Sequence, residues 1–228
     1  MKGMEKTSNI GRKFNEDGSI RFFPGNTIIS KVLESNEIYP IITHISKEFQ
    51  MADKGESYHF LPWDSLHMTM IQGVCDEDRR PSLWSRYLPL DMKLSQVDDF
   101  FETKYKEVKQ LPETRMVFDY IDLSKKAILV RFVPKDEQSA ENLKNFRDEV
   151  SDKLGVRFPD HDNYGFHISI AYQLWEMTQK EKENIQKVCE TLSQEMKHNK
   201  VSFTLQQPEM TYFYNMYTFH STRILRED

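Results

Sequence analysis

Alternating apolar and polar positions mark two short segments whose histidines lie one hundred positions apart. Leu66-His67-Met68-Thr69-Met70 and Phe166-His167-Ile168-Ser169-Ile170 both have a period of two, which is typical of a β-strand with one buried face. Successive side chains of a strand point to opposite faces. Each segment therefore predicts a histidine and a hydroxyl group together on the face opposite the core.

The remaining hydrophobic pattern predicts strands and helices in alternation. Helices are indicated where apolar residues recur at i, i+3, i+4 and i+7, and strands where β-branched and aromatic residues cluster between turn residues. We expect strands at 27–33, 116–123, 127–133, 201–205 and 210–219, and helices over 38–49, 95–108, 140–154 and 178–196.

These elements occur twice in one order: strand, helix, histidine strand, helix, strand. The first set spans about 27–123 and the second about 127–219, with few identical side chains between them, so the repeat is one of pattern. We predict one α+β domain, residues 1–228, with two lobes related by a pseudo-twofold axis. Each lobe would hold a mainly antiparallel sheet flanked by helices, with a cleft between the histidine strands. Residues 1–20 are polar and are predicted to form an N-terminal extension.

Composition narrows the class of protein. With 38% hydrophobic and 29% charged residues the chain has a globular composition, and its net charge of −5 argues against extended DNA binding, which depends on phosphate neutralisation. Cys75 and Cys189 offer neither a disulfide framework nor metal-ligand spacing. The N-terminus lacks an apolar leader, and no segment approaches the length of a membrane span. We therefore expect a cytoplasmic monomer without membrane binding.

The paired motif is a moderately specific signal. Histidine followed two residues later by Ser or Thr occurs at His44, His67, His167 and His220, but only the middle two copies have apolar residues at both x positions. In a shuffled sequence, two such matches arise in under about one case in a hundred. His44 lies in a predicted helix, where residues two apart point to nearly opposite sides. A single such strand histidine is usually structural, whereas two copies in matching contexts favour catalysis.

Two imidazoles and two hydroxyl groups suit phosphodiester hydrolysis. Opening a cyclic phosphodiester with water requires one proton to be removed from the nucleophile and one to be delivered to the leaving oxygen. A neutral and a protonated histidine can do this, because histidine titrates near neutral pH. Thr69 and Ser169 would donate hydrogen bonds to the non-bridging oxygens, where charge builds in the transition state. The pseudo-symmetric pattern does not reveal which histidine is the base.

His67-Met68-Thr69-Met70 and His167-Ile168-Ser169-Ile170 resemble the duplicated His-x-Thr/Ser-x signatures of the 2H phosphoesterase superfamily. The order of elements is similar to its bilobal fold, and Pro24-Gly25-Asn26-Thr27 and Tyr164-Gly165-Phe166-His167 resemble a bacterial branch of unassigned substrate. The resemblance implies a metal-independent phosphodiesterase or cyclic phosphodiesterase with two catalytic histidines and two phosphate-binding hydroxyl groups. Its expected substrate is a 2′,3′-cyclic-type phosphodiester on a nucleotide, a sugar or an RNA end.

Three further residues are candidate substrate contacts. Tyr164 and Tyr172 lie near the ends of the second histidine strand, where aromatic rings can stack on a base. Strand tyrosines also serve as sheet packing, which is the simpler interpretation of each. Arg131, in the middle of a predicted strand, is a candidate phosphate clamp.

Two alternatives remain open. His161 lies between Asp160 and Asp162 and could join His167 in a metal site, although no CxxC or HExxH spacing supports this, so we predict no metal and no cofactor. The second alternative is a non-catalytic module on the same fold that binds a nucleotide or RNA end. Turnover of a generic 2′,3′-cyclic nucleotide in the presence of a chelator would separate the enzyme from the binding module.

Overall fold

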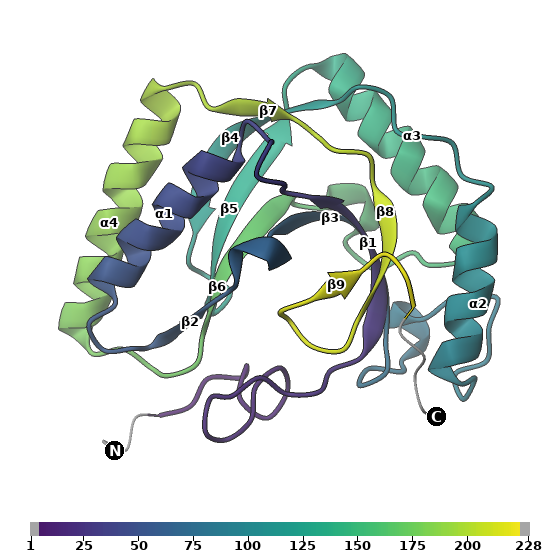
Figure 1. Ribbon diagram of the computed structural model, residues 1–228, viewed down its shortest axis with the longest axis horizontal. Coiled ribbons are helices and arrows are strands. Elements are labelled where there is room, and N and C mark those ends of the chain that lie inside the picture. The colour runs from purple at the N-terminus through teal and green to yellow at the C-terminus, as the bar shows by residue number, and fades with distance from the viewer. Residues whose placement is uncertain (1–4, 224–228) are drawn as a thin grey trace.

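Antiparallel strands form one continuous curved sheet in the computed structural model, which describes residues 5–223 (Figure 1). The strand order is β7-β4-β5-β6-β3-β1-β8-β9, and β2 pairs with β6 off this path. The two histidine strands, β3 and β6, are therefore neighbours in the middle of the sheet. The strands of this region are β1 Gly25–Lys31, β2 Tyr58–Phe60, β3 His67–Cys75, β4 Arg115–Asp122, β5 Ala127–Pro134, β6 His167–Gln173, β7 Ser202–Thr204, β8 Glu209–Phe213 and β9 Phe219–His220.

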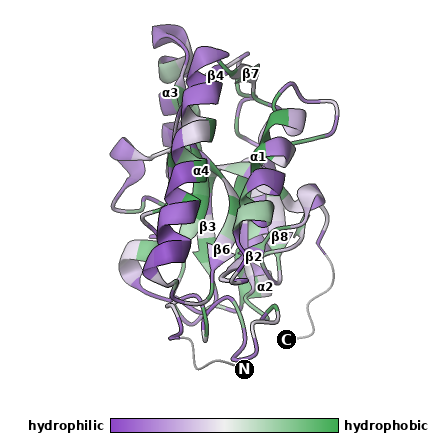
Figure 2. Cartoon of the chain, turned by 90° about the vertical axis from the view of Figure 1, so that its left-hand side faces the viewer, coloured by the Kyte–Doolittle hydropathy of each residue, from purple (hydrophilic) through white to green (hydrophobic). Residues whose placement is uncertain are grey.

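The helices pack in two pairs, α1 with α4 and α2 with α3, on opposite sides of the view in Figure 1. Their outward surfaces are mainly hydrophilic, while β3 and β6 behind them are hydrophobic (Figure 2). The predicted ends are confirmed where local chemistry defines them: Thr178 and Glu181 form a capping box, and Gly155 ends α3 with a φ of 71°. The helices are α1 Tyr39–Ala52, α2 Leu94–Tyr105, α3 Glu137–Leu154 and α4 Gln179–His198, with 3₁₀ turns at Trp63–Ser65, Pro81–Leu83 and His161–Asn163.

The period-two pattern of the histidine strands places their apolar residues in the core. Met68 and Met70 on β3, and Ile168 and Ile170 on β6, are at most 1% exposed. Fully burying such a side chain stabilises the fold by roughly 1.5–3 kcal/mol. This burial holds the opposite face of both strands, which carries the histidines and hydroxyl groups, toward the other side of the sheet.

The α+β class and the antiparallel pairing are confirmed, but the prediction of two sheets is wrong. Strands β3 and β6 pair antiparallel with Met68 opposite Ile168, which joins both parts into one sheet. The last strand of each predicted set also pairs within the other set, because β4 pairs with β5 and β8 pairs with β1. Periodicity could not show this exchange, since it contains no information on which strands become neighbours. The duplication itself stays a prediction.

Two further expectations need correction. The strand predicted over 210–219 is broken into β8 and β9 by a bend at residues 214–217. The described part of the predicted N-terminal extension is docked on the sheet: Phe14 is fully buried, and the side chain and backbone of Thr7 bond the backbone of Gln173 and Leu174. One large apolar residue within a polar segment is enough to anchor it, because its ring fills a site on the sheet surface.

Candidate active site

The two histidine motifs line one cavity of about 380 Å³. His67 and Thr69 reach it from β3, and His167 and Ser169 reach it from β6. Tyr164 and Tyr172 also contribute to its wall. The structure therefore brings together six of the seven predicted site residues, although their chemical roles stay predictions. The other wall residues come from the N-terminal segment, from the region after β3 and from the β8–β9 hairpin: Arg12, Lys13, Phe23, Asn26, Thr27, Leu61, Gln72, Gly73, Val74, Cys75, Asp78, Leu83, Phe158, Phe213, Met216 and Phe219.

The register between β3 and β6 arranges the four motif side chains crosswise. Met68 is paired with Ile168 in antiparallel orientation. One residue to either side of that pair, His67 comes opposite Ser169 and Thr69 comes opposite His167. Each imidazole thus has a hydroxyl group from the other strand as its nearest cross-strand neighbour. We call these four residues the His-hydroxyl tetrad.

Both histidine strands contain a bulge at the same distance from their histidine. On β3, Ile71 and Thr69 face consecutive residues of β1, so Met70 is the extra residue. On β6, Ala171 and Ser169 face consecutive residues of β5, so Ile170 is the extra residue. A bulge shifts the alternation by one residue. Positions 72 and 172 consequently return to the cavity wall, where Gln72 and Tyr172 are found.

Backbone hydrogen bonds orient both imidazoles in the same way. His67 Nδ1 lies 2.7 Å from the carbonyl oxygen of Ser65, and His167 Nδ1 lies 2.8 Å from that of Gly165. A carbonyl oxygen only accepts hydrogen bonds, so each Nδ1 carries a hydrogen and donates it. Nε2 of each neutral ring is then left with a free lone pair, which is the requirement for a general base.

Both histidines lose basicity in the cavity. Burial lowers the pKa of His67 to about 4, and the charges of Lys13 and Lys31 act in the same direction, while the bond to Ser65 opposes them. Burial also lowers the pKa of His167, and the neighbouring Arg131 adds to this effect. Both imidazoles are therefore neutral at neutral pH while the cavity holds no anion.

Arg131 is the one predicted site residue that the structure keeps away from the cavity wall. Its guanidinium group is buried in an ion pair with Asp122, at 2.7 Å between Nη2 and Oδ2. Its Nη1 donates to the carbonyl oxygen of Gly165 at 2.9 Å, the same oxygen that accepts from His167. These contacts occupy the donors that a phosphate clamp would need. Arg131 instead supports the backbone carbonyl group that orients His167.

Tyr164 and Tyr172 have different surroundings. The Tyr164 hydroxyl group is hydrogen-bonded to Thr69, and burial raises its pKa to about 12. The guanidinium carbon of Arg147 lies 4.4 Å from the centre of the Tyr164 ring, which holds the ring in place. Lys13 Nζ lies 4.1 Å from the centre of the Tyr172 ring. Stacking of either ring on a base stays a prediction, and the ammonium group already occupies one side of Tyr172.

Several wall residues were not singled out from the sequence. Lys13 precedes Phe14, whose isolated apolar character was the only local signal that the N-terminal segment docks. Phe219 of β9 lies against His67, with 4.2 Å between the ring centres. Gln72 follows the β3 bulge, which no short sequence pattern announces. All three reach the cavity through contacts between segments far apart in the chain.

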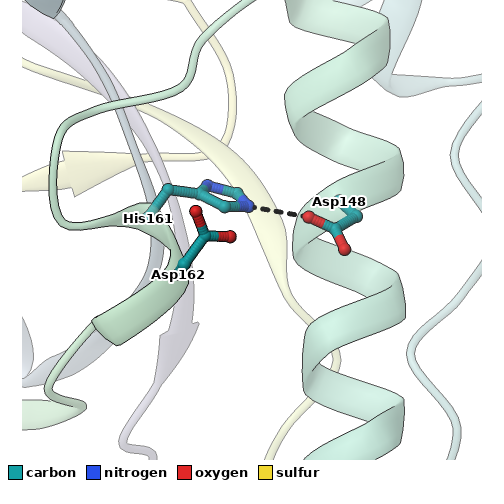
Figure 3. Close-up of side chains that lie close together, drawn as sticks. All are labelled: Asp148, His161 and Asp162. Carbon is teal, nitrogen blue, oxygen red and sulfur yellow. Dashed lines mark hydrogen bonds and ion pairs between the residues drawn. The ribbon is translucent and has the colours of Figure 1, made fainter.

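His161 belongs to a different cluster from the one proposed in the metal alternative. It lies with Asp148 and Asp162, and its Nε2 is 3.0 Å from Asp148 Oδ1 (Figure 3). Arg157 pairs with both carboxylates, and Lys144 also pairs with Asp148. These cations already neutralise the carboxylates that a metal ion would need, so the donor set does not fit a metal ion. Of the described side chains that line the cavity, none belongs to this cluster.

Comparisons with known proteins agree with the fold. A crystal structure of a conserved protein of unknown function, ATU0111 from Agrobacterium tumefaciens str. C58, is similar with a TM-score of 0.85 and 23% identity, covering 94% of this chain and 91% of that one. A crystal structure of TT0787 of Thermus thermophilus gives a TM-score of 0.46 at 11% identity, covering 82% and 86%, which is too low for an argument. No curated protein matches the chain.

Two findings bear on the class of protein. Among the helices of residues 5–223, none is long and apolar enough to cross a membrane. The family model 2H-phosphodiest, described as a domain of unknown function (DUF1868), matches residues 13–127, which is half of the chain and includes the first motif. The structure adds the second motif at the same cavity. The chain therefore belongs to the 2H-phosphodiest family (DUF1868), within the 2H phosphoesterase superfamily.

Proposed function

We propose that this protein is a phosphodiesterase that hydrolyses a cyclic phosphodiester of the 2′,3′ type with His67 and His167 as general base and general acid. The observation that carries the proposal is the His-hydroxyl tetrad: two imidazoles with the same Nδ1 orientation and two hydroxyl groups in one cavity. Membership of the family supports the same class of reaction.

In the proposed reaction, the neutral imidazole accepts a proton from water at Nε2 while the water oxygen bonds to phosphorus. The protonated imidazole donates its proton to the ring oxygen as the bond between that oxygen and phosphorus breaks. Thr69 and Ser169 donate hydrogen bonds to the non-bridging oxygens, where negative charge increases in the transition state. One proton is removed and one is delivered, so the pair of histidines ends with its roles exchanged.

The substrate itself supplies the condition for the acid. In the empty cavity both histidines are neutral, because burial lowers both pKa values. An anionic phosphate beside the imidazoles favours the protonated form and raises those pKa values. Binding of the phosphodiester is therefore expected to bring one proton into the site, and the acid forms where the substrate is present.

The cavity also limits the size of the substrate. Its volume of about 380 Å³ lies within the range of small-molecule sites, roughly 300–1,000 Å³. Phe23, Phe213, Met216 and Phe219 form an apolar wall beside the tetrad. This combination suits a phosphodiester on a nucleotide, a sugar derivative or a short RNA end better than an extended nucleic acid, whose binding would depend on many phosphate contacts.

Hydrolysis of adenosine 2′,3′-cyclic phosphate in excess EDTA tests the proposal. We expect turnover in EDTA, loss of most activity in His67→Ala and His167→Ala, and full activity in His44→Ala, whose histidine lies on the exposed side of α1. Saturable binding without product would support the non-catalytic alternative. Recovery of lost activity by zinc or manganese would support a metal-dependent reaction, and equal activity in His67→Ala and His44→Ala would refute the role of the tetrad.

A further inference from the structure

The N-terminal segment places an uncompensated positive charge in the wall of the cavity. Two described cations line the cavity, Arg12 and Lys13. Arg12 has a carboxylate partner, because its Nη2 lies 3.7 Å from Asp78 Oδ2. Lys13 has none among residues 5–223: the contact recorded for its ammonium group is the Tyr172 ring, 4.1 Å away. Apolar and aromatic surroundings strengthen the field of such a charge.

The backbone of Lys13 is held firmly. The next residue, Phe14, is fully buried, with its ring centre 4.9 Å from that of His59 and 5.8 Å from that of Tyr172. The amide of Lys13 donates to the carbonyl oxygen of Asn9 at 3.0 Å, and the carbonyl oxygen of Lys13 accepts from Arg21 at 3.1 Å. These contacts direct the Lys13 side chain over β6 and into the cavity.

Lys13 lies at one end of the His-hydroxyl tetrad. Tyr172 follows Ser169 on β6, and Ser169 is opposite His67, so the ammonium group lies beyond the end formed by His67 and Ser169. In agreement, its charge contributes to the lowered pKa of His67. At the opposite end, the guanidinium group of Arg131 is occupied by Asp122. The charge at the first end breaks the pseudo-symmetry of the site.

The position of Lys13 distinguishes it from a ligand of the scissile phosphate. Three residues separate Ser169 from Tyr172, a path of roughly 8–10 Å along a bulged strand. The scissile phosphate already has two hydroxyl donors and one protonated imidazole in the proposed reaction. A cation beyond that group, on an aromatic ring, is placed for another anion of the same substrate molecule.

We propose that Lys13 binds a second phosphate group of the substrate, on the part that extends past His67 and Ser169, and thereby sets the direction in which the substrate crosses the two histidines. The inference rests on the proposed function of this cavity and narrows its substrate class to phosphodiesters that carry a further phosphate. A nucleoside 2′,3′-cyclic phosphate with a 5′-phosphate, or an RNA 3′-end with its last internucleotide phosphate, has this chemistry.

Calorimetric titration with two probes that contain no diester tests the inference separately from catalysis. The probes are adenosine 3′-monophosphate and adenosine 3′,5′-bisphosphate, at low ionic strength and with EDTA. We expect the wild-type protein to bind the bisphosphate about tenfold more tightly, the size of one charge-assisted hydrogen bond. Lys13→Gln is expected to reduce that preference to near one, and Lys13→Arg to restore it. Lys187→Gln, on the exposed surface of α4, serves as the matched control and should keep the preference.

The outcomes are distinguishable from failure of the proposed function. Equal affinity for the two probes in the wild-type protein, or an unchanged preference in Lys13→Gln, overturns the role of Lys13 even if a cyclic nucleotide is hydrolysed. Failure of both probes to bind overturns it as well. A preference that depends on Lys13 supports the second-phosphate site even if no cyclic nucleotide is hydrolysed, in which case only the proposed reaction is refuted.

Discussion

The pH dependence of kcat/KM follows directly from the surroundings of the two imidazoles. This parameter reports ionisation of the free enzyme. In the free cavity, burial lowers the pKa of His67 to about 4 and lowers that of His167 below its usual 6.5. The proposed reaction needs one neutral and one protonated imidazole, whichever residue has which role. The singly protonated form is therefore the productive one, and it is most populated between the two pKa values.

The magnitude can be worked out from these shifts. Above the higher pKa, the fraction of enzyme that retains the single proton falls tenfold for each pH unit. Because the pKa of His167 lies below 6.5, kcat/KM near pH 8.5 is expected to be at least about 100-fold below its maximum. A lowered pKa means that the proton is lost at lower pH, so activity disappears as the pH rises. The profile of kcat is expected at higher pH, because the bound phosphate raises both pKa values.

Initial rates with adenosine 2′,3′-cyclic phosphate well below KM, in EDTA and at constant ionic strength, measure this profile between about pH 4.5 and pH 9. Circular dichroism at each pH establishes that the protein remains folded. A kcat/KM that is level or still rising between about pH 6.5 and pH 8.5 would refute the reasoning. Such a profile would indicate a base that ionises at higher pH, such as a metal-bound water.

Three further predictions concern single side chains. His67→Ala and His167→Ala should each lower kcat by about 10²–10⁴-fold, and the double variant should lose much less than the product, because groups that act together are not additive. His44→Ala should match the wild-type rate in the same steady-state assay. Arg131→Met should lower the free energy of unfolding by about 3–5 kcal/mol in urea titrations, because it leaves the buried Asp122 without its cation. Adding Asp122→Asn should recover part of that stability, and a loss below about 1 kcal/mol in the single variant would contradict the assigned pairing.

Local sequence patterns determined much of the secondary structure. Alternation around His67 and His167 was sufficient to predict two strands with a buried apolar face, because side-chain direction in a strand depends only on position parity. The capping box at Thr178 and the glycine at position 155 located two helix ends, since both signals act within one turn of helix. The break between β8 and β9 was missed, because the aromatic run that spans it favours strand throughout.

The pairing of distant segments was decided by tertiary structure. The sequence placed a histidine and a hydroxyl group on each of two strands, but the register of Met68 with Ile168 arranges all four in one crosswise group. Likewise, the sequence pattern suggested Arg131 as a phosphate ligand, whereas the fold places it beside Asp122. An arginine in a strand has no local feature that distinguishes a buried ion pair from a ligand contact.

Lys13 illustrates the physical reason for the difference. Its neighbours in sequence are polar, so composition assigned it to a solvated extension. Burial of the single ring of Phe14 against His59 and Tyr172, far away in the chain, places the ammonium group in the cavity. Periodicity records which face of an element is apolar, and this property of a few consecutive residues is fully contained in the sequence. Which apolar faces meet depends on the free energy of the whole packed chain, and the charges and donors of the site follow from that packing.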